Sequence, residues 1–311
     1  MRTVDDKEWE GLRRIGGLRR FAVAISILNL LGHTVFGFEQ SYAQPLVALA
    51  AAYLIELGVE SIDSWAAGRP AKWRGGIRAF VDFMLPAHIT ALAISMLLYA
   101  NDRLWVVAFA SAVAVASKAL FKVRIASGSR HFLNPSNFGV SVTLLLFPWV
   151  GIAQPYQFTE NIGPVGYWLL PAIIVASGTF LNTRFTRKLP LIGAWLGGFA
   201  FQGLIRTVIT GGPVLVPLVP MTGVAFVLFT FYMITDPATS PSTARSQIAF
   251  GLSVAAAYGM LVALHAVFGL FLGLTLICII RGAALYCLQM MAAHKTRRVS
   301  TIKTAAAINE A

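Results

Sequence analysis

The chain has 311 residues, of which 57% are hydrophobic and only 12% are charged, and its mean hydropathy is +0.71. A soluble domain is usually about a quarter charged, so this chain has too few charged side chains to cover a surface that faces water. The composition argues against an ordinary soluble enzyme. It predicts an all-α, polytopic protein of the cytoplasmic (inner) membrane.

Ten hydrophobic runs of 16 to 21 residues follow one another along the chain, close to the ~20 residues that cross a bilayer. They cover residues 21–38, 43–62, 80–100, 104–121, 138–153, 165–182, 189–209, 217–235, 247–264 and 269–287. We expect ten transmembrane helices, with one or two short segments entering the membrane without crossing it.

Basic residues are distributed unevenly over the loops between these runs. If the N-terminus is cytoplasmic, 22 of the 25 Lys and Arg residues fall on the cytoplasmic side. Arg103 and Arg206 fall on the outer side, and Arg281 lies within the last run. This positive-inside pattern predicts that both termini are cytoplasmic. The net charge of +12 then faces anionic lipid and does not indicate a nucleic-acid partner.

The number of runs suggests two halves of five spans each. The expected parts are a cytoplasmic segment 1–20, a first half 21–153, an outer linker 154–164, a second half 165–290 and a cytoplasmic tail 291–311. Because each half has an odd number of spans, the halves would be inverted relative to each other, as in many transporter folds.

Two loops on the cytoplasmic side, Ser127–Phe138 and Thr235–Thr243, are rich in Asn, Ser, Thr and Pro. Such residues interrupt helices and leave backbone groups free. One interpretation is helix capping, by Ser136 or Asn137 in the first loop and by Ser242 or Thr243 in the second. The other is a pair of broken-helix ends that face each other across a ligand site, since free backbone at membrane depth needs a cavity or a partner.

These two loops carry a family resemblance. Arg130-His-Phe-Leu-Asn-Pro-Ser-Asn-Phe-Gly139 resembles the Phe-Asn-Pro segment of the RnfD/NqrB family, the flavin-carrying membrane subunits of bacterial Rnf and sodium-pumping quinone oxidoreductase complexes. Phe231-Tyr-Met-Ile-Thr-Asp-Pro237 resembles that family's aromatic–Met–Ala–Thr–Asp–Pro stretch, and the order and spacing of the motifs match. Phe147–Asn161, Ser177–Arg187 and Met221–Thr230 are similar to RnfD-like (UnbU-type) proteins of enediyne antibiotic gene clusters.

The resemblance implies a membrane subunit that binds a flavin, FMN or riboflavin, and passes electrons between redox partner proteins. The flavin-bearing members attach FMN to a Thr in an outer Ser-Gly-Ala-Thr stretch. Residues 154–164 contain no such tetrad, and the nearest match, Ser177-Gly-Thr179, lies inside a predicted span, where small residues favour helix packing. Any flavin is therefore expected to bind non-covalently.

The two motif loops supply the expected flavin contacts, which are Arg130, His131, Asn134, Asn137, Phe138, Thr235 and Asp236. Cationic groups beside Asn amides suit a phosphate or an electron-rich ring, and the amides suit the ring edge. Asp236 is expected to order its loop, because its carboxylate would oppose a reduced, anionic flavin. We expect the two loops to approach each other.

Glu56, Glu60 and Asp63 recur at i, i+4 and i+7, so they share one face of the second span. A carboxylate inside the membrane costs roughly 2.5–3.5 kcal/mol and needs a partner. Lys118 is the expected partner of Glu56 or Glu60, with Arg281 as the alternative. The pattern fits either a structural ion pair or an ion or proton path. We predict no metal site.

A second function class uses the same scaffold without redox chemistry. It is a small-molecule transporter or channel, or an export and self-resistance protein of an enediyne cluster. The missing Ser-Gly-Ala-Thr tetrad favours this class. The redox class needs partner proteins, because Cys278 and Cys287 in one run cannot form an iron–sulfur site.

Overall fold

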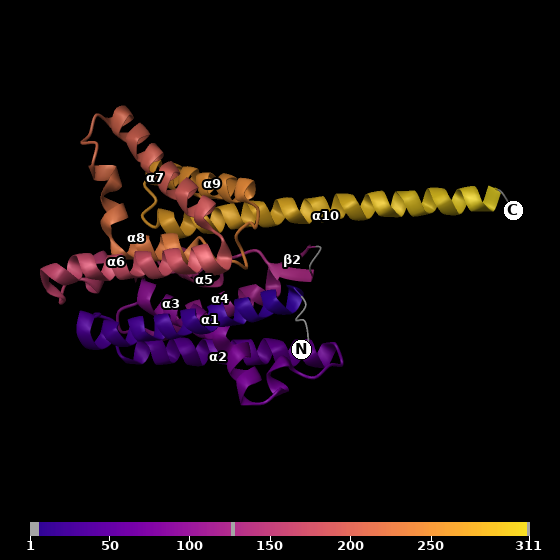
Figure 1. The fold of residues 1–311 in the computed structure, drawn as a ribbon, viewed down its shortest axis with the longest axis horizontal. Helices are drawn as coiled ribbons and strands as arrows, with labels where there is room; N and C mark the ends of the chain where they lie inside the picture. Colours follow the sequence, from indigo (N-terminus) through magenta and orange to yellow (C-terminus); the bar gives the residue numbers. More distant parts are fainter. Residues whose placement is uncertain (1–5, 126–127, 310–311) are drawn as a thin grey trace.

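The computed structural model describes residues 6–125 and 128–309 and forms a bundle of helices (Figure 1). The α-helices are α1 (Asp6–Leu31), α2 (Ala43–Ala66), α3 (Ile77–Leu97), α4 (Leu104–Leu120), α5 (Pro135–Leu146), α6 (Gly163–Leu181), α7 (Leu189–Thr210), α8 (Val224–Leu228), α9 (Ala244–Ala263) and α10 (Gly269–Asn309). Three π-helical turns, η1 (Gly32–Phe36), η4 (Asn182–Thr186) and η6 (Phe229–Met233), continue α1, α6 and α8. The 3₁₀ turns are η2 (Lys72–Arg74), η3 (Pro155–Phe158) and η5 (Val216–Thr222).

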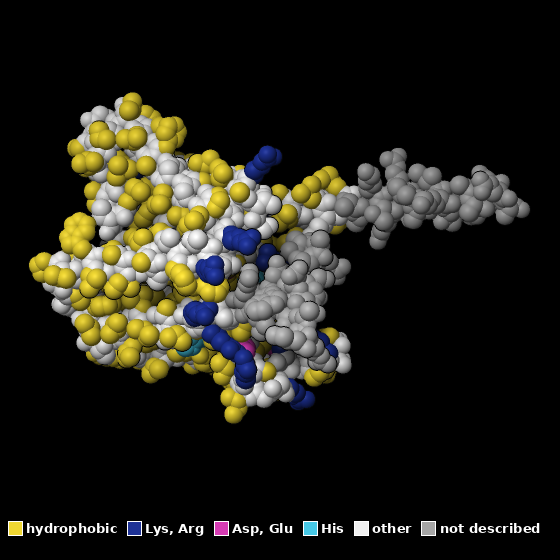
Figure 2. Space-filling model, viewed as in Figure 1, with side chains coloured by type: hydrophobic (Ala, Val, Ile, Leu, Met, Phe, Trp, Pro, Cys, Tyr) yellow, Lys and Arg dark blue, Asp and Glu magenta, His cyan; other side chains and the backbone are white. Residues whose placement is uncertain are grey.

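Seven helical stretches in the described part of the chain are long and apolar enough to cross a membrane, or eight if one bent pair is a single span. They are the Ile15–Phe36 part of α1 with η1, α2, α3, α6 with η4, α7, α9 and the Gly269–Met291 part of α10. Figure 2 shows hydrophobic side chains over most of the visible face, with Lys and Arg gathered toward the side where α1 begins. This is the surface of a helical protein that is embedded in a membrane.

Each of the ten predicted runs falls on helical structure, but two of them are interrupted. The fifth run was expected to extend to residue 153, whereas α5 ends at Leu146, because Pro148 disfavours a helical residue before it. With 12 residues, α5 is about 18 Å long and falls short of ~30 Å of hydrocarbon. The eighth run is bent by 70° between η5 and the α8–η6 helix, at Gly223. α4, with 17 residues, is also shorter than the seven long helices.

Two expected segment boundaries are not breaks in the helices. α1 runs from Asp6 through the predicted segment boundary at residue 20, and α10 continues through the predicted tail to Asn309. The tail is rich in Ala, Lys and Arg, which are strong helix formers. α1 begins and α10 ends on the same side of the bundle (Figure 1).

Two short antiparallel sheets interrupt the expected all-α pattern. β1 (Leu98–Tyr99) pairs with β4 (Gly151–Ile152), and β2 (Lys122–Ile125) forms a hairpin with β3 (Gly128–His131). The hairpin precedes α5, so it positions the first motif loop.

Helices at the same position in the two predicted halves have similar neighbours. In the first half α2 packs on α4, α4 on α5 and α1 on α3; in the second half α7 packs on α9, α9 on α10 and α6 on α8. α1 and α6 also end alike, in a π turn. The amide of Phe38 closes the first turn and that of Lys188 the second, each on the carbonyl six residues earlier, at 2.9 and 3.0 Å. The backbone is left-handed just before each amide, at Gly37 (φ 76°) and Arg187 (φ 53°).

Candidate ligand site where the two motif loops meet

The first motif loop enters α5 through a helix cap. Asn134 has an extended backbone, and its Oδ1 accepts hydrogen bonds from the Asn137 amide (3.0 Å) and the Ser136 hydroxyl (3.1 Å). Pro135 occupies the first helical position, where its missing N–H has no cost. Capping by Ser136 or Asn137 was therefore the wrong choice, because the cap lies at Asn134. In the second loop the expected Thr243 caps α9, accepting from the Ser246 amide.

Asn134 also joins the two motif loops. Its Nδ2 donates to the carbonyl of Met233, the last residue of η6, at 3.0 Å, and Asn134 is only 6% exposed. Two residues further on, the buried Thr235 hydroxyl donates to the Phe231 carbonyl at 2.6 Å. The two broken-helix ends thus meet, as the sequence predicts.

Asn137 connects α5 to α10. Its Nδ2 donates to the Phe271 carbonyl (2.9 Å) and to the Thr275 hydroxyl (2.7 Å). A carbonyl can only accept, so the nitrogen must face Phe271 and the Oδ1 must point the other way. Asn137 is 1% exposed, and this Oδ1 has no hydrogen-bond partner among the described residues. A buried acceptor without a donor is uncommon and calls for an explanation.

One face of α10 contacts the first motif loop and the start of α5. Phe271, Thr275, Cys278 and Gly282 are spaced i, i+4, i+7 and i+11, so they share that face. At its end the Phe132 ring packs so closely on Gly282 that a Cβ there would lie 2.3 Å from the ring. The first motif loop is therefore held by hydrogen bonds at one end of this face and by ring packing at the other.

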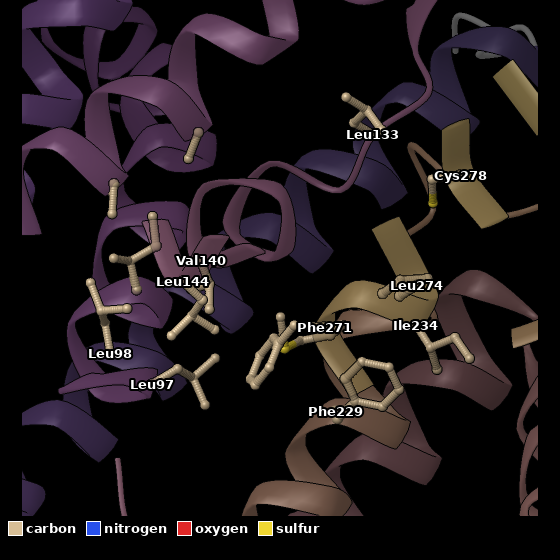
Figure 3. Packing of buried hydrophobic residues seen from close by; sticks show 14 of the residues in the cluster. Leu97, Leu98, Leu133, Val140, Leu144, Phe229, Ile234, Phe271, Leu274 and Cys278 are labelled. Atoms are coloured by element: carbon tan, nitrogen blue, oxygen red, sulfur yellow. The ribbon is translucent and has the colours of Figure 1, made fainter. Parts of the chain in front are cut away.

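The core beneath the junction contains residues of both predicted halves. Figure 3 shows Leu133 near Cys278, and Phe271 and Leu274 of α10 near Phe229 and Ile234. Val140 and Leu144 of α5 extend toward Leu97, the last residue of α3, and Leu98 of β1. Because this cluster is continuous, the junction cannot open without exposing apolar surface on both sides of it.

Asp236 orders its own loop, as expected. Its Oδ1 accepts from the Ala238 amide at 3.1 Å and its Oδ2 from the Thr239 hydroxyl at 2.9 Å, while its carbonyl accepts from the Ser240 hydroxyl at 2.6 Å. The carboxylate is thus used within the turn of the chain that follows η6.

Two cations that were not expected at this site also hold the second loop. Lys188, just before α7, is 4% exposed and donates through Nζ to the Pro241 and Ser240 carbonyls. Arg281 of α10 donates through Nη1 to the Thr239 carbonyl at 2.6 Å, so it is not the partner of Glu56 or Glu60. Arg281 could have been found from its position inside an apolar run. Lys188 gave no comparable signal, because it follows two other basic residues in an ordinary basic loop.

The remaining expected contact residues lie beside the junction. Phe138 packs edge-to-face on Phe121, with ring centroids 5.4 Å apart, and so belongs to the α4–α5 packing. His131 is in β3, opposite Lys122 of β2, and Arg130 is exposed in the same strand. A groove of about 250 Å³ lies between this hairpin and α10, lined by Lys122, Val123, Phe132, Ile279, Gly282, Ala283 and Tyr286.

The small-residue stretch that most resembles a flavin attachment site is used in helix packing. Ser177 lies in α6 and its hydroxyl is 2.8 Å from the Tyr232 hydroxyl. A Cβ on Gly178 would lie 2.6 Å from Phe231, so α6 and η6 approach closely there.

The acidic stripe of α2 forms ion pairs. Lys118 donates to Glu56, a pairing expected from the sequence. Glu60 is instead bound by Arg69 (2.6 Å) and Lys72 (2.9 Å), from the turn that follows α2. Sequence reasoning missed these partners because it searched other spans instead of the end of the same helix.

The chain matches no protein-family model and no curated protein. The likeness to the RnfD/NqrB family therefore depends on the motif stretches themselves, and above all on the two loops that meet at Asn134.

Proposed function

We propose that this protein is a membrane electron-transfer subunit of the RnfD/NqrB type that binds a flavin non-covalently at the junction of the two motif loops. The observation that carries the proposal is the Asn134–Met233 contact, which brings the two family-like motifs, 99 residues apart, to one place. The unpartnered Oδ1 of Asn137 supports it further. The edge of a flavin ring carries an N–H group, which could donate the hydrogen bond that the Asn137 Oδ1 does not receive from the protein. In this respect the residues present fit the cofactor.

We further propose that the fold consists of ten spans in two inverted halves, with both termini in the cytoplasm. The matching helix neighbours and the matching π turns of α1 and α6 support the repeat. Seven of the ten spans would be the long helices. The other three would be α4, α5 and the bent η5–α8–η6 segment. In this orientation the flavin site opens toward the cytoplasm, where redox partner proteins would exchange electrons with it; the cofactor supplies the redox chemistry and the chain supplies its position.

Flavin fluorescence during titration of the detergent-purified protein tests the proposal. Riboflavin should bind, and Asn137→Ala should weaken binding about 2- to 10-fold, because a neutral hydrogen bond contributes about 0.5–1.5 kcal/mol. Thr275→Val is the matched control: it removes the same Asn137–Thr275 bond but keeps the Oδ1, so its affinity should equal that of wild type. Protein that carries no flavin and takes none up would contradict the proposal.

A transporter or export function is the alternative, and one observation favours it. The amide nitrogens of Asn134 and Asn137 already bind protein carbonyls, so they are not free to recognise a ligand. On that alternative the junction is a hinge between two halves that rock against each other. Substrate uptake into protein-containing vesicles, without any bound flavin, would support it.

A further inference from the structure

Positive charge is concentrated around the loop that follows η6. Lys188, Arg281 and Arg130, together called the cationic cluster here, come from the start of α7, from α10 and from β3. Lys188 and Arg281 hold the carbonyls of Thr239, Ser240 and Pro241 from two sides. Two of these cations therefore contact one short loop from two elements, and the charge of Arg130 lies near enough to lower the pKa of Lys188.

Burial makes this concentration costly. Lys188 is 4% exposed, and an ammonium group removed from water needs a compensating charge or several hydrogen bonds. Burial lowers the pKa of Lys188 to about 8, Asp236 opposes this change, and Arg130 and Arg281 add to it. Among the described residues whose charge changes the pKa of Lys188, two are cations and one is a carboxylate. Together with Lys188 itself, three cationic groups thus lie near one carboxylate.

The hydrogen-bonding capacity of the cluster is also only partly used. A guanidinium has five N–H donors, and Arg281 donates one of them to Thr239 in the described structure. The Asp236 carboxylate accepts from its own loop, at Ala238 and Thr239. The excess of two positive charges and the spare donors match a dianion with several acceptor oxygens.

We propose that the cationic cluster binds a phosphate monoester, which makes the site selective for FMN over riboflavin. This inference rests on the proposed flavin function and extends it. Phosphate accepts several charge-assisted hydrogen bonds, and arginine suits it through its planar fork. The same chemistry is offered by the headgroup of phosphatidic acid, which is the other source of such a group at a membrane surface.

Parallel titrations of the full-length, flavin-free protein with FMN and riboflavin test this selectivity. FMN should bind about 10- to 100-fold more tightly, as expected for hydrogen bonds to charged groups. Lys188→Met and Arg281→Met should each reduce FMN affinity more than riboflavin affinity, so that the two affinities approach each other. Arg245→Met is the control, because Arg245 is exposed and this substitution removes the same net charge.

Inorganic phosphate provides a readout that does not depend on flavin. It should compete with FMN but not with riboflavin, and it should raise the melting temperature of wild type but not of Lys188→Met. Equal affinities for the two flavins, unchanged by both variants, would overturn the inference and leave the proposed function standing. If neither flavin binds but phosphate or phosphatidic acid still stabilises only the wild type, the phosphate site is supported and the flavin function is not.

Discussion

The acidic stripe of α2 and the junction of the two motif loops use buried charge in opposite ways. On α2, each carboxylate in the membrane has a cation beside it: Glu56 has Lys118, and Glu60 has Arg69 and Lys72. At the junction, cations outnumber the carboxylate that acts on them, and they bind carbonyls instead. A balanced set of charges satisfies itself and needs no ligand, whereas an unbalanced set remains able to bind one.

The largest effect is expected at the Glu56–Lys118 pair. Lys118→Met leaves Glu56 as an uncompensated charge inside the bundle, which should lower the free energy of unfolding by about 3–5 kcal/mol. The pair is mostly buried, with exposed side-chain fractions of 14% and 17%. Thermal melting in detergent measures the loss, and adding Glu56→Gln should recover part of it. Additive losses in the double variant would show that the two side chains do not interact.

Lys72→Met is the control for this pair, because Lys72 is 61% exposed and Glu60 keeps Arg69. It should cost less than about 1 kcal/mol, as exposed ion pairs do. If Lys72→Met lowered the free energy of unfolding as much as Lys118→Met, the burial of an ion pair would not determine how much it stabilises this protein.

A middle-sized effect is expected where packing, not charge, holds the junction. Gly282→Leu would collide with the Phe132 ring and should cost about 1–3 kcal/mol, the usual range for an overfilled core. Gly193→Leu adds the same side chain to α7 in open space and should leave the melting temperature unchanged. A similar loss in both variants would indicate a general effect of leucine in these helices.

The last prediction concerns the pH dependence of the junction, where the change is spread over more than two pH units. The pKa of Lys188 in the folded protein is about 8, below its value of ~10.4 in an unfolded chain. Between these values the unfolded chain binds more protons, so stability should rise with pH, by at most about 1.4 kcal/mol per unit. The cost of burying the charged amine is thus present below pH 8 and is relieved above it. The difference in slope between wild type and Lys188→Met isolates this group from other titrations, and equal slopes would contradict the assignment.

The sequence predicted the regions that depend on local pattern. Hydrophobic runs placed the helices, and Asn-Pro and Asp-Pro steps placed the interrupted ends, because these residues control the backbone directly. The roles of Asp236 and Thr243 followed for the same reason, since their hydrogen bonds lie within a few residues of each.

The rest depended on long-range packing. Nothing near Asn137 in the sequence indicates that its amide nitrogen binds Phe271 and Thr275, and Phe138 was expected to face a ligand although it packs on Phe121. Lys188 resembles any basic residue of a loop between two spans, and its burial is set by the loop that folds over it. Single-sequence reasoning has no information on which distant carbonyl a side chain will meet.

The short α5 also has a consequence for how the protein is made. Its anchor Asn137 binds Phe271, 134 residues later in the chain. At ~5–20 residues per second, a ribosome needs on the order of ten seconds to synthesise that distance. During this interval α5 is too short to hold a bilayer by itself and has no partner for its buried amide. Until then α5 can pack only on the earlier helices α3 and α4, so α10 is the helix that completes the packing around α5.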